Sequence, residues 1–161
     1  MGLGWEYFLA RRYDEAIDQL RRTLALDPSY WDPRELLSLI YSQKGMHEIA
    51  VALCDSAMAD DPHHDPQGDC GYVYGRAGRR QQALDMIRRL TVPSQGREID
   101  MFGASEAYVG LGDADHAIEW LRRAAQKRSR YLVLLKLHPV FDPLRSDPRF
   151  QALLRDLGIP S

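Results

Sequence analysis

Residues 27–62 decide the fold, and they read DPSYWDPRELLSLIYSQKGMHEIAVALCDSAMADDP. Two stretches within them, residues 32–43 and 47–59, repeat apolar residues at helical spacing. Gly45 lies between the two and supplies the backbone freedom of a tight turn. Asp-Pro pairs stand at both ends, where proline moves the preceding residue out of the helical region. The segment therefore predicts a pair of helices joined by a tight turn.

The same pattern recurs along the chain. Its markers are a tyrosine, a glycine and an alanine, found at Tyr41, Gly45 and Ala50, at Tyr74, Gly78 and Ala83, and at Tyr108, Gly112 and Ala117. The sets follow one another at 33 and 34 residues, and a period of about 34 residues is typical of a helical repeat array. We divide the chain into a partial unit at residues 1–28, units at 29–62, 63–95 and 96–128, and C-terminal capping helices at 129–161.

These recurring residues resemble the tetratricopeptide repeat (TPR) family over about residues 3–128. The family's usual Trp is replaced by Arg34, Gln67 and Met101, so the repeats are degenerate. The resemblance implies an all-α fold: a right-handed TPR superhelix, which is an α-solenoid of antiparallel helix pairs, with a C-terminal capping helix. It also implies a scaffold for protein-protein interaction, and we predict no enzymatic activity.

The C-terminal region breaks the repeat. Residues 131–137 form an apolar run, which we interpret as a helix lying on the last repeat. Asp147 is placed to cap a helix that begins at Pro148 and ends at Gly158. Residues 139–158 resemble the terminal segment of TPR regions in multidomain bacterial signalling proteins. This resemblance implies the C-terminal docking or regulatory module of such a protein.

The concave groove is where this family binds its partners, and the first helix of each repeat lines it. The matching positions that we select as the partner-binding groove are Trp5, Phe8, Glu35, Leu39, Tyr72, Arg76, Phe102 and Glu106. They lack the Lys and Asn with which some members hold a peptide carboxylate. Aromatic and apolar side chains with intervening carboxylates instead suit a peptide or helix segment that carries apolar anchors and an Arg or Lys. The alternative is that Trp5 and Tyr72 serve only inter-repeat packing.

The expected partner is a protein or peptide segment, and another domain of the same parent protein would also fit. An alternative function is homo-oligomerisation, with a homodimer formed through the N-terminal edge at residues 5–9. A less favoured alternative is nucleic-acid binding through a convex arginine stripe, formed by Arg21-Arg22, Arg88-Arg89 and Arg122-Arg123. The net charge of −2 and the acidic residues near these pairs count against it.

Composition and motifs favour a cytoplasmic protein without cofactors. No segment approaches the 18 apolar residues of a membrane span, and the first 30 residues lack the apolar run of a signal peptide. His63-His64-Asp65 contains metal-ligand residue types, but their spacing does not bring three ligands together, so we predict no metal site. Cys54 and Cys70 are expected to act as small buried apolar residues, and a disulfide between them is the alternative in an oxidising compartment.

Overall fold

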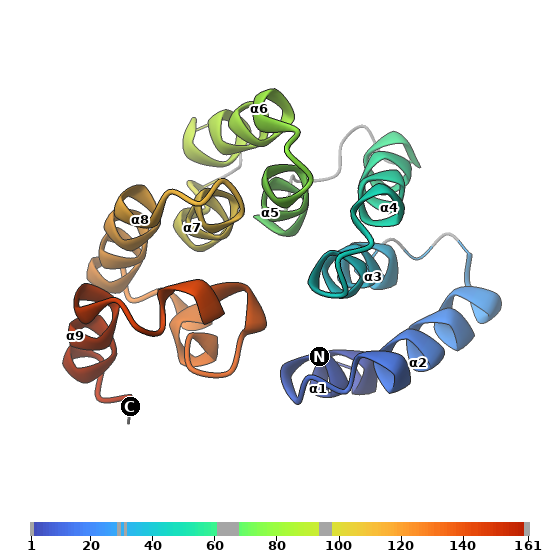
Figure 1. Ribbon diagram of the computed structural model, residues 1–161, viewed down its shortest axis with the longest axis horizontal. Helices are drawn as coiled ribbons and strands as arrows, with labels where there is room; N and C mark the ends of the chain where they lie inside the picture. The colour runs from blue at the N-terminus through green and yellow to red at the C-terminus, as the bar shows by residue number, and fades with distance from the viewer. Residues whose placement is uncertain (1, 29, 31, 61–67, 94–97, 160–161) are drawn as a thin grey trace.

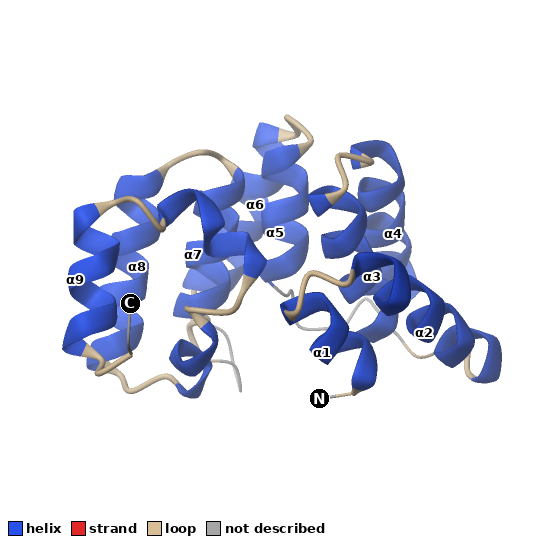
Figure 2. Cartoon of the chain, turned by 60° about the horizontal axis from the view of Figure 1, so that its bottom comes forward, coloured by secondary structure: helices blue, strands red, loops and turns tan. Residues whose placement is uncertain are grey.

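The computed structural model describes residues 2–28, 30, 32–60, 68–93 and 98–159. In these residues the chain forms helices joined by short connections, without a strand (Figure 2). The helices are α1 (Leu3–Leu9), α2 (Tyr13–Leu26), α3 (Asp32–Gln43), α4 (His47–Asp60), α5 (Gly68–Arg76), α6 (Arg80–Thr91), α7 (Met101–Gly110), α8 (Ala114–Gln126) and α9 (Pro148–Asp156). Two 3₁₀ helices, η1 (Arg130–Leu134) and η2 (Pro139–Leu144), lie between α8 and α9.

Consecutive helices pair and stack into an arc (Figure 1). Helices α1, α3, α5 and α7 form the inner, concave layer, and α2, α4, α6 and α8 form the outer layer. Each inner helix packs against the outer helix that follows it in the chain, and α5 also packs against α3 and α7. The all-α solenoid predicted from the sequence is therefore confirmed.

The predicted markers occupy the positions that join the helices of each pair. Ala50, Ala83 and Ala117 are fully buried, so each lets two helices come close together. Gly45, Gly78 and Gly112 turn the chain with φ between 73° and 76°, a region that L side chains rarely adopt. In the first unit Arg11 occupies the equivalent position with φ of 59°.

Helix ends follow the capping residues. Asp113 and Asp147 accept hydrogen bonds from the backbone N–H groups of His116 and Arg149, as expected for N-caps. The first helix of the fourth unit begins at Met101, because Asp100 caps it by accepting a hydrogen bond from the Gly103 N–H. The Asp61-Pro62 end of the second unit lies outside the described residues.

Cys54 and Cys70 are both fully buried, as predicted, and a disulfide joins them. The bond connects α4 to α5 and closes a loop with a sequence separation of 16. The alternative that the sequence left open is thus the arrangement in the structure.

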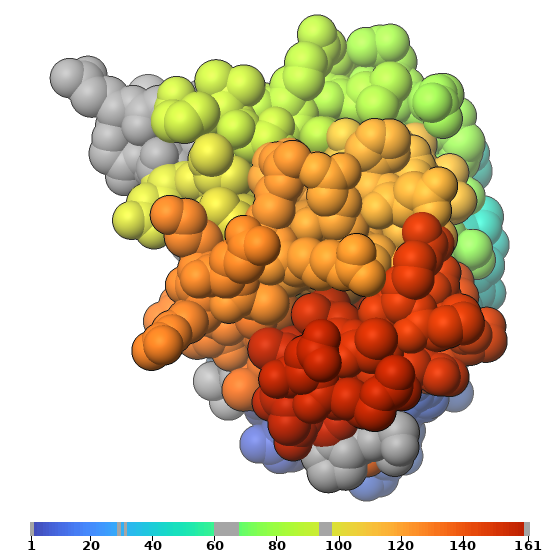
Figure 3. All heavy atoms as spheres, turned by 90° about the vertical axis from the view of Figure 1, so that its left-hand side faces the viewer, coloured from blue at the N-terminus to red at the C-terminus, as the bar shows by residue number. Residues whose placement is uncertain are grey.

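The C-terminal region turns back toward the concave side of the arc (Figure 1). The apolar run expected to be a helix on the last repeat forms η1, which contacts α8, and η2 then contacts α7. Helix α9 returns to pack on α8, and Figure 3 shows it covering that end of the stack. In the described parts of the chain, every helix falls short of the length and apolarity that a membrane crossing requires.

Glycines allow α5 and α7 to approach closely. A Cβ at Gly68 would meet the Cα of Gly103, and a Cβ at Gly110 would meet the backbone of Tyr72. The glycines of α5 and α7 therefore permit backbone contact between repeats.

We expect Gly110→Ala to destabilise the protein, because its methyl group would overlap the Tyr72 backbone, which cannot move without shifting α5. Overpacking of this kind costs about 1 to 3 kcal/mol. Denaturant unfolding measures the loss. Gly2→Ala is the control, since a Cβ there has no neighbour within 4 Å, and an equal effect of both substitutions would contradict the prediction.

Candidate functional site

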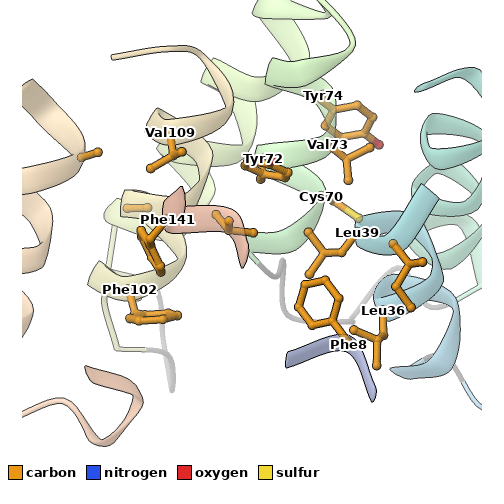
Figure 4. Close-up of a cluster of buried hydrophobic side chains, with 14 of the residues drawn as sticks. Phe8, Leu36, Leu39, Cys70, Tyr72, Val73, Tyr74, Phe102, Val109 and Phe141 are labelled. Carbon is orange, nitrogen blue, oxygen red and sulfur yellow. The ribbon is translucent and has the colours of Figure 1, made fainter. Parts of the chain in front are cut away.

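The ring of His138 occupies the concave face, where it meets aromatic rings from both ends of the arc. Its centroid lies 5.4 Å from Trp5 and 5.5 Å from Phe8 of α1, 6.1 Å from Phe102 of α7 and 5.6 Å from Phe141 of η2. Figure 4 shows Phe102 next to Phe141, and Phe8 near Leu36 and Leu39. We call these five rings the aromatic cluster. It connects the first helix to the C-terminal segment across the groove.

The local sequence fixes the position of His138. The residue caps η2, where Pro139 follows it and the Val140 N–H donates to its Nδ1 atom at 3.4 Å. Only 1% of its surface is exposed, and burial lowers its pKa to about 3. The imidazole is therefore neutral in this site.

An exposed ion pair also joins the turn that follows α1 to η2. Arg11 Nη2 lies 2.7 Å from Asp142 Oδ1, and both side chains are more than 40% exposed. Exposed pairs contribute about 0 to 1 kcal/mol, so the aromatic cluster, and not this pair, is the main connection between α1 and η2.

A cavity of about 320 Å³ lies beside the aromatic cluster. Its walls include the rings of Trp5, Phe102, Tyr131 and His138. Five carboxyl groups from α3, α5, α7 and the residue that caps α7 also line it: Asp32, Glu35, Asp69, Asp100 and Glu106. Of the described residues that line it, none is Lys or Arg. We call it the acidic cavity.

Burial and mutual repulsion raise the pKa values of three carboxyl groups of this cavity, those of Glu35, Asp69 and Glu106. The pKa of Glu35 is raised to about 9, first by burial and then by the charges of Asp69 and Asp32. The pKa of Asp69 is raised to about 7 by burial and by Asp32 and Asp100. Burial followed by Asp69 and Asp100 raises the pKa of Glu106 well above its ordinary value. A cation in the cavity would favour the ionised form of each group.

Glu106 also has an oxygen without a hydrogen bond. Its side chain is 5% exposed, and the buried Oε1 atom has no hydrogen-bond partner in the described structure. His138 Nε2 lies 3.3 Å away, but the two atoms lack hydrogen-bond alignment. The indole Nε1 of Trp5 is likewise buried without a partner. Two residues that line the cavity thus each carry a buried polar atom without a hydrogen bond.

The family model "Tetratricopeptide repeat" matches residues 101–126, which comprise α7 and α8. The match identifies α7 and α8 as a tetratricopeptide repeat. A solved structure titled "Crystal structure of MamA" is similar to it, with 17% identity, coverage of 96% of this chain and 92% of that chain, and a TM-score of 0.47. A search of the curated proteins found no match.

The structure separates the predicted groove residues into three groups. Trp5, Glu35, Phe102 and Glu106 line the acidic cavity. Phe8, Leu39 and Tyr72 are buried in the core, where the Tyr72 hydroxyl accepts from Gln43 Nε2 at 3.1 Å. Arg76 is exposed at the end of α5. We expected all eight to be accessible to a partner, but Phe8, Leu39 and Tyr72 are covered by the core. The role of the eight residues in binding stays a prediction.

Sequence reasoning missed Asp32 and Asp100 as site residues, because they share no repeat position with each other or with the predicted groove residues. In the register of the tyrosine, glycine and alanine markers, Glu35 corresponds to Gly68 and Phe102, and Asp100 corresponds to Pro33. Tyr131 and His138 were also missed, because they lie in the non-repetitive C-terminal region, where no period indicates which face they join.

The other candidate sites remain outside this cluster. The paired arginines are exposed, and those with acidic partners include Arg88 with Asp85 and Arg123 with Glu119. The segment with His63, His64 and Asp65 lies outside the described residues. Among the residues that are described, no three His, Cys, Asp or Glu side chains could hold one metal ion.

We expect Glu35→Gln to stabilise the protein at alkaline pH. A raised pKa means that folded Glu35 keeps its proton while unfolded Glu35 loses it above about pH 4.3, so wild-type stability falls as pH rises toward 9. Glutamine has no such dependence. The free energy of unfolding of the variant, measured by denaturant unfolding, should exceed that of the wild type by on the order of 1 to 2 kcal/mol at pH 9 and by much less at pH 5.

The matched control is Glu48→Gln, which removes a carboxyl group that is 83% exposed. A pH profile of Glu35→Gln that superimposes on the wild type, or on that control, would disprove the raised pKa.

Proposed function

We propose that this TPR protein is an interaction scaffold that takes a peptide or helix segment of a partner protein on its concave side. The observation that supports this most directly is the acidic cavity, which lies within the concave layer and combines aromatic walls with five carboxyl groups. An aromatic surface provides apolar contact, and the carboxyl groups select a basic side chain.

The C-terminal segment restricts where such a partner can lie. Tyr131, Leu134 and His138 line one side of the cavity, and Phe141 is fully buried next to Phe102. The partner segment would therefore contact the part of the groove between α1, α3, α5, α7 and η1, and not the full length of the arc. This placement narrows the sequence prediction to Trp5, Glu35, Phe102 and Glu106.

The biological context is proposed from the sequence resemblance. The chain would act as a docking or regulatory module of a bacterial signalling protein, with another protein or a domain of the same parent as its partner. The cytoplasmic location stays a prediction, and the Cys54–Cys70 disulfide counts against it, because such bonds persist mainly in oxidising compartments.

Homo-oligomerisation through the N-terminal edge stays an alternative. Trp5 and Phe8, which we expected at that edge, pack against His138 of the same chain. Their rings are thus already in contact, which favours the groove over a dimer as the binding surface.

Selection of displayed random peptides on the immobilised protein tests the proposed function. We expect a selected peptide, synthesised and titrated by calorimetry, to bind Trp5→Ala at least about tenfold more weakly than wild type, as for a central aromatic contact. Trp120→Ala is the control, because it removes an equivalent partly buried ring from α8 in the outer layer.

Circular dichroism checks that both variants keep their helices. Equal binding by wild type and Trp5→Ala, greater loss in Trp120→Ala, or failure to select any peptide would contradict concave binding.

A further inference from the structure

We propose that the acidic cavity binds the cationic end of an Arg or Lys side chain supplied by the partner segment. This inference rests on the proposed function and deepens it by assigning the chemistry of recognition. It concerns the interior of the cavity, where Glu106 lies, and not the general charge of the protein surface.

Charge is the first argument. Besides Glu35, the carboxyl groups of Asp32, Asp69, Asp100 and Glu106 line the cavity, and no Lys or Arg is among its described lining residues. A buried carboxyl group either keeps its proton or pairs with a cation, because an isolated charge is costly to remove from water. His138 does not fulfil this role, since burial keeps its imidazole neutral. A cation from outside the chain would stabilise the ionised form of these carboxyl groups.

The unpaired oxygen of Glu106 is the second argument. A buried acceptor without a hydrogen bond is uncommon in folded proteins and costs stability. Oε1 lies on a residue that lines the cavity and is 4% exposed, so bulk water reaches little of it. A guanidinium or ammonium group carries N–H donors without acceptors, which suits carboxylate oxygens of this kind.

The walls supply the third argument. Trp5, Phe102 and Tyr131 line the same cavity, and aromatic faces attract organic cations and cover aliphatic stems. A volume of about 320 Å³ falls at the lower end of the range for organic ligand sites. The described residues provide no set of three ligands for one metal ion, whereas they do provide separate carboxyl groups on several sides. The shape and composition favour a side chain over a bare ion.

Blocked tripeptides test this inference with the full-length protein. The probe is acetyl-Leu-Arg-Leu-amide, and its counterpart contains citrulline, which has nearly the shape of arginine but no charge. Spermidine is the third probe and represents a free amine without a peptide. Binding is followed by calorimetry and by the indole N–H resonances of Trp5 and Trp120 in ¹H–¹⁵N spectra.

We expect the arginine peptide to bind and to shift the Trp5 resonance but not that of Trp120. Binding should weaken by at least about tenfold with the citrulline peptide and in Glu106→Gln, because each removes a charged hydrogen bond. Asp18→Asn on α2 is the matched control, since it replaces one exposed carboxyl group outside the cavity by an amide. It should bind as wild type does.

Three results would overturn the inference. These are equal affinity for the arginine and citrulline peptides, equal loss in Asp18→Asn and Glu106→Gln, or binding of spermidine alone at the Trp5 site. If displayed peptides bind the concave side but lack Arg and Lys, the scaffold function is supported and the cation site is wrong. If no displayed peptide depends on Trp5, the proposed function itself fails.

Discussion

The burial of His138 in the concave face is the interaction on which the rest of the site depends. Its ring contacts Trp5 and Phe8 at one end of the arc and Phe102 and Phe141 at the other. Aromatic pairs at these distances contribute about 0.5 to 1.5 kcal/mol each beyond the area they bury. Without this cluster, α1 would keep its packing on α2 and α3 but lose its ring contacts with the C-terminal segment, and the cavity would lose the wall that η1 and His138 provide.

Two structural features form the acidic cavity: the stacking of the inner helices and the return of the C-terminal segment over them. The stack of α3, α5 and α7 brings carboxyl groups of three repeat units to one cavity. The C-terminal segment then covers them and removes water, which raises the pKa values of Glu35, Asp69 and Glu106. Burying these carboxyl groups close together lowers the free energy of unfolding of the chain. Groups held in this way are characteristic of functional sites, since their electrostatic cost is offset when a complementary ligand binds.

The repeat period predicted the fold well because each marker has a local physical cause. Gly45, Gly78 and Gly112 reach a backbone region that favours glycine, and Ala50, Ala83 and Ala117 fit between helices. The sequence also identified Trp5, Glu35, Phe102 and Glu106, which do line the cavity. It could not show that Phe8, Leu39 and Tyr72 are covered, because that depends on how adjacent repeats stack. Nor could it place His138, since the C-terminal segment has no repeat to align with.

The ionisation of Glu35 and Glu106 tests most directly the claim that this cavity is built for a cation. Their side-chain carboxyl ¹³C resonances can be followed across pH in the wild-type protein, with and without acetyl-Leu-Arg-Leu-amide. We predict that both groups titrate above the usual glutamate range in the free protein, Glu35 near pH 9, and that the peptide lowers both midpoints. Ordinary midpoints in the free protein, or midpoints that the peptide leaves unchanged, would contradict the claim.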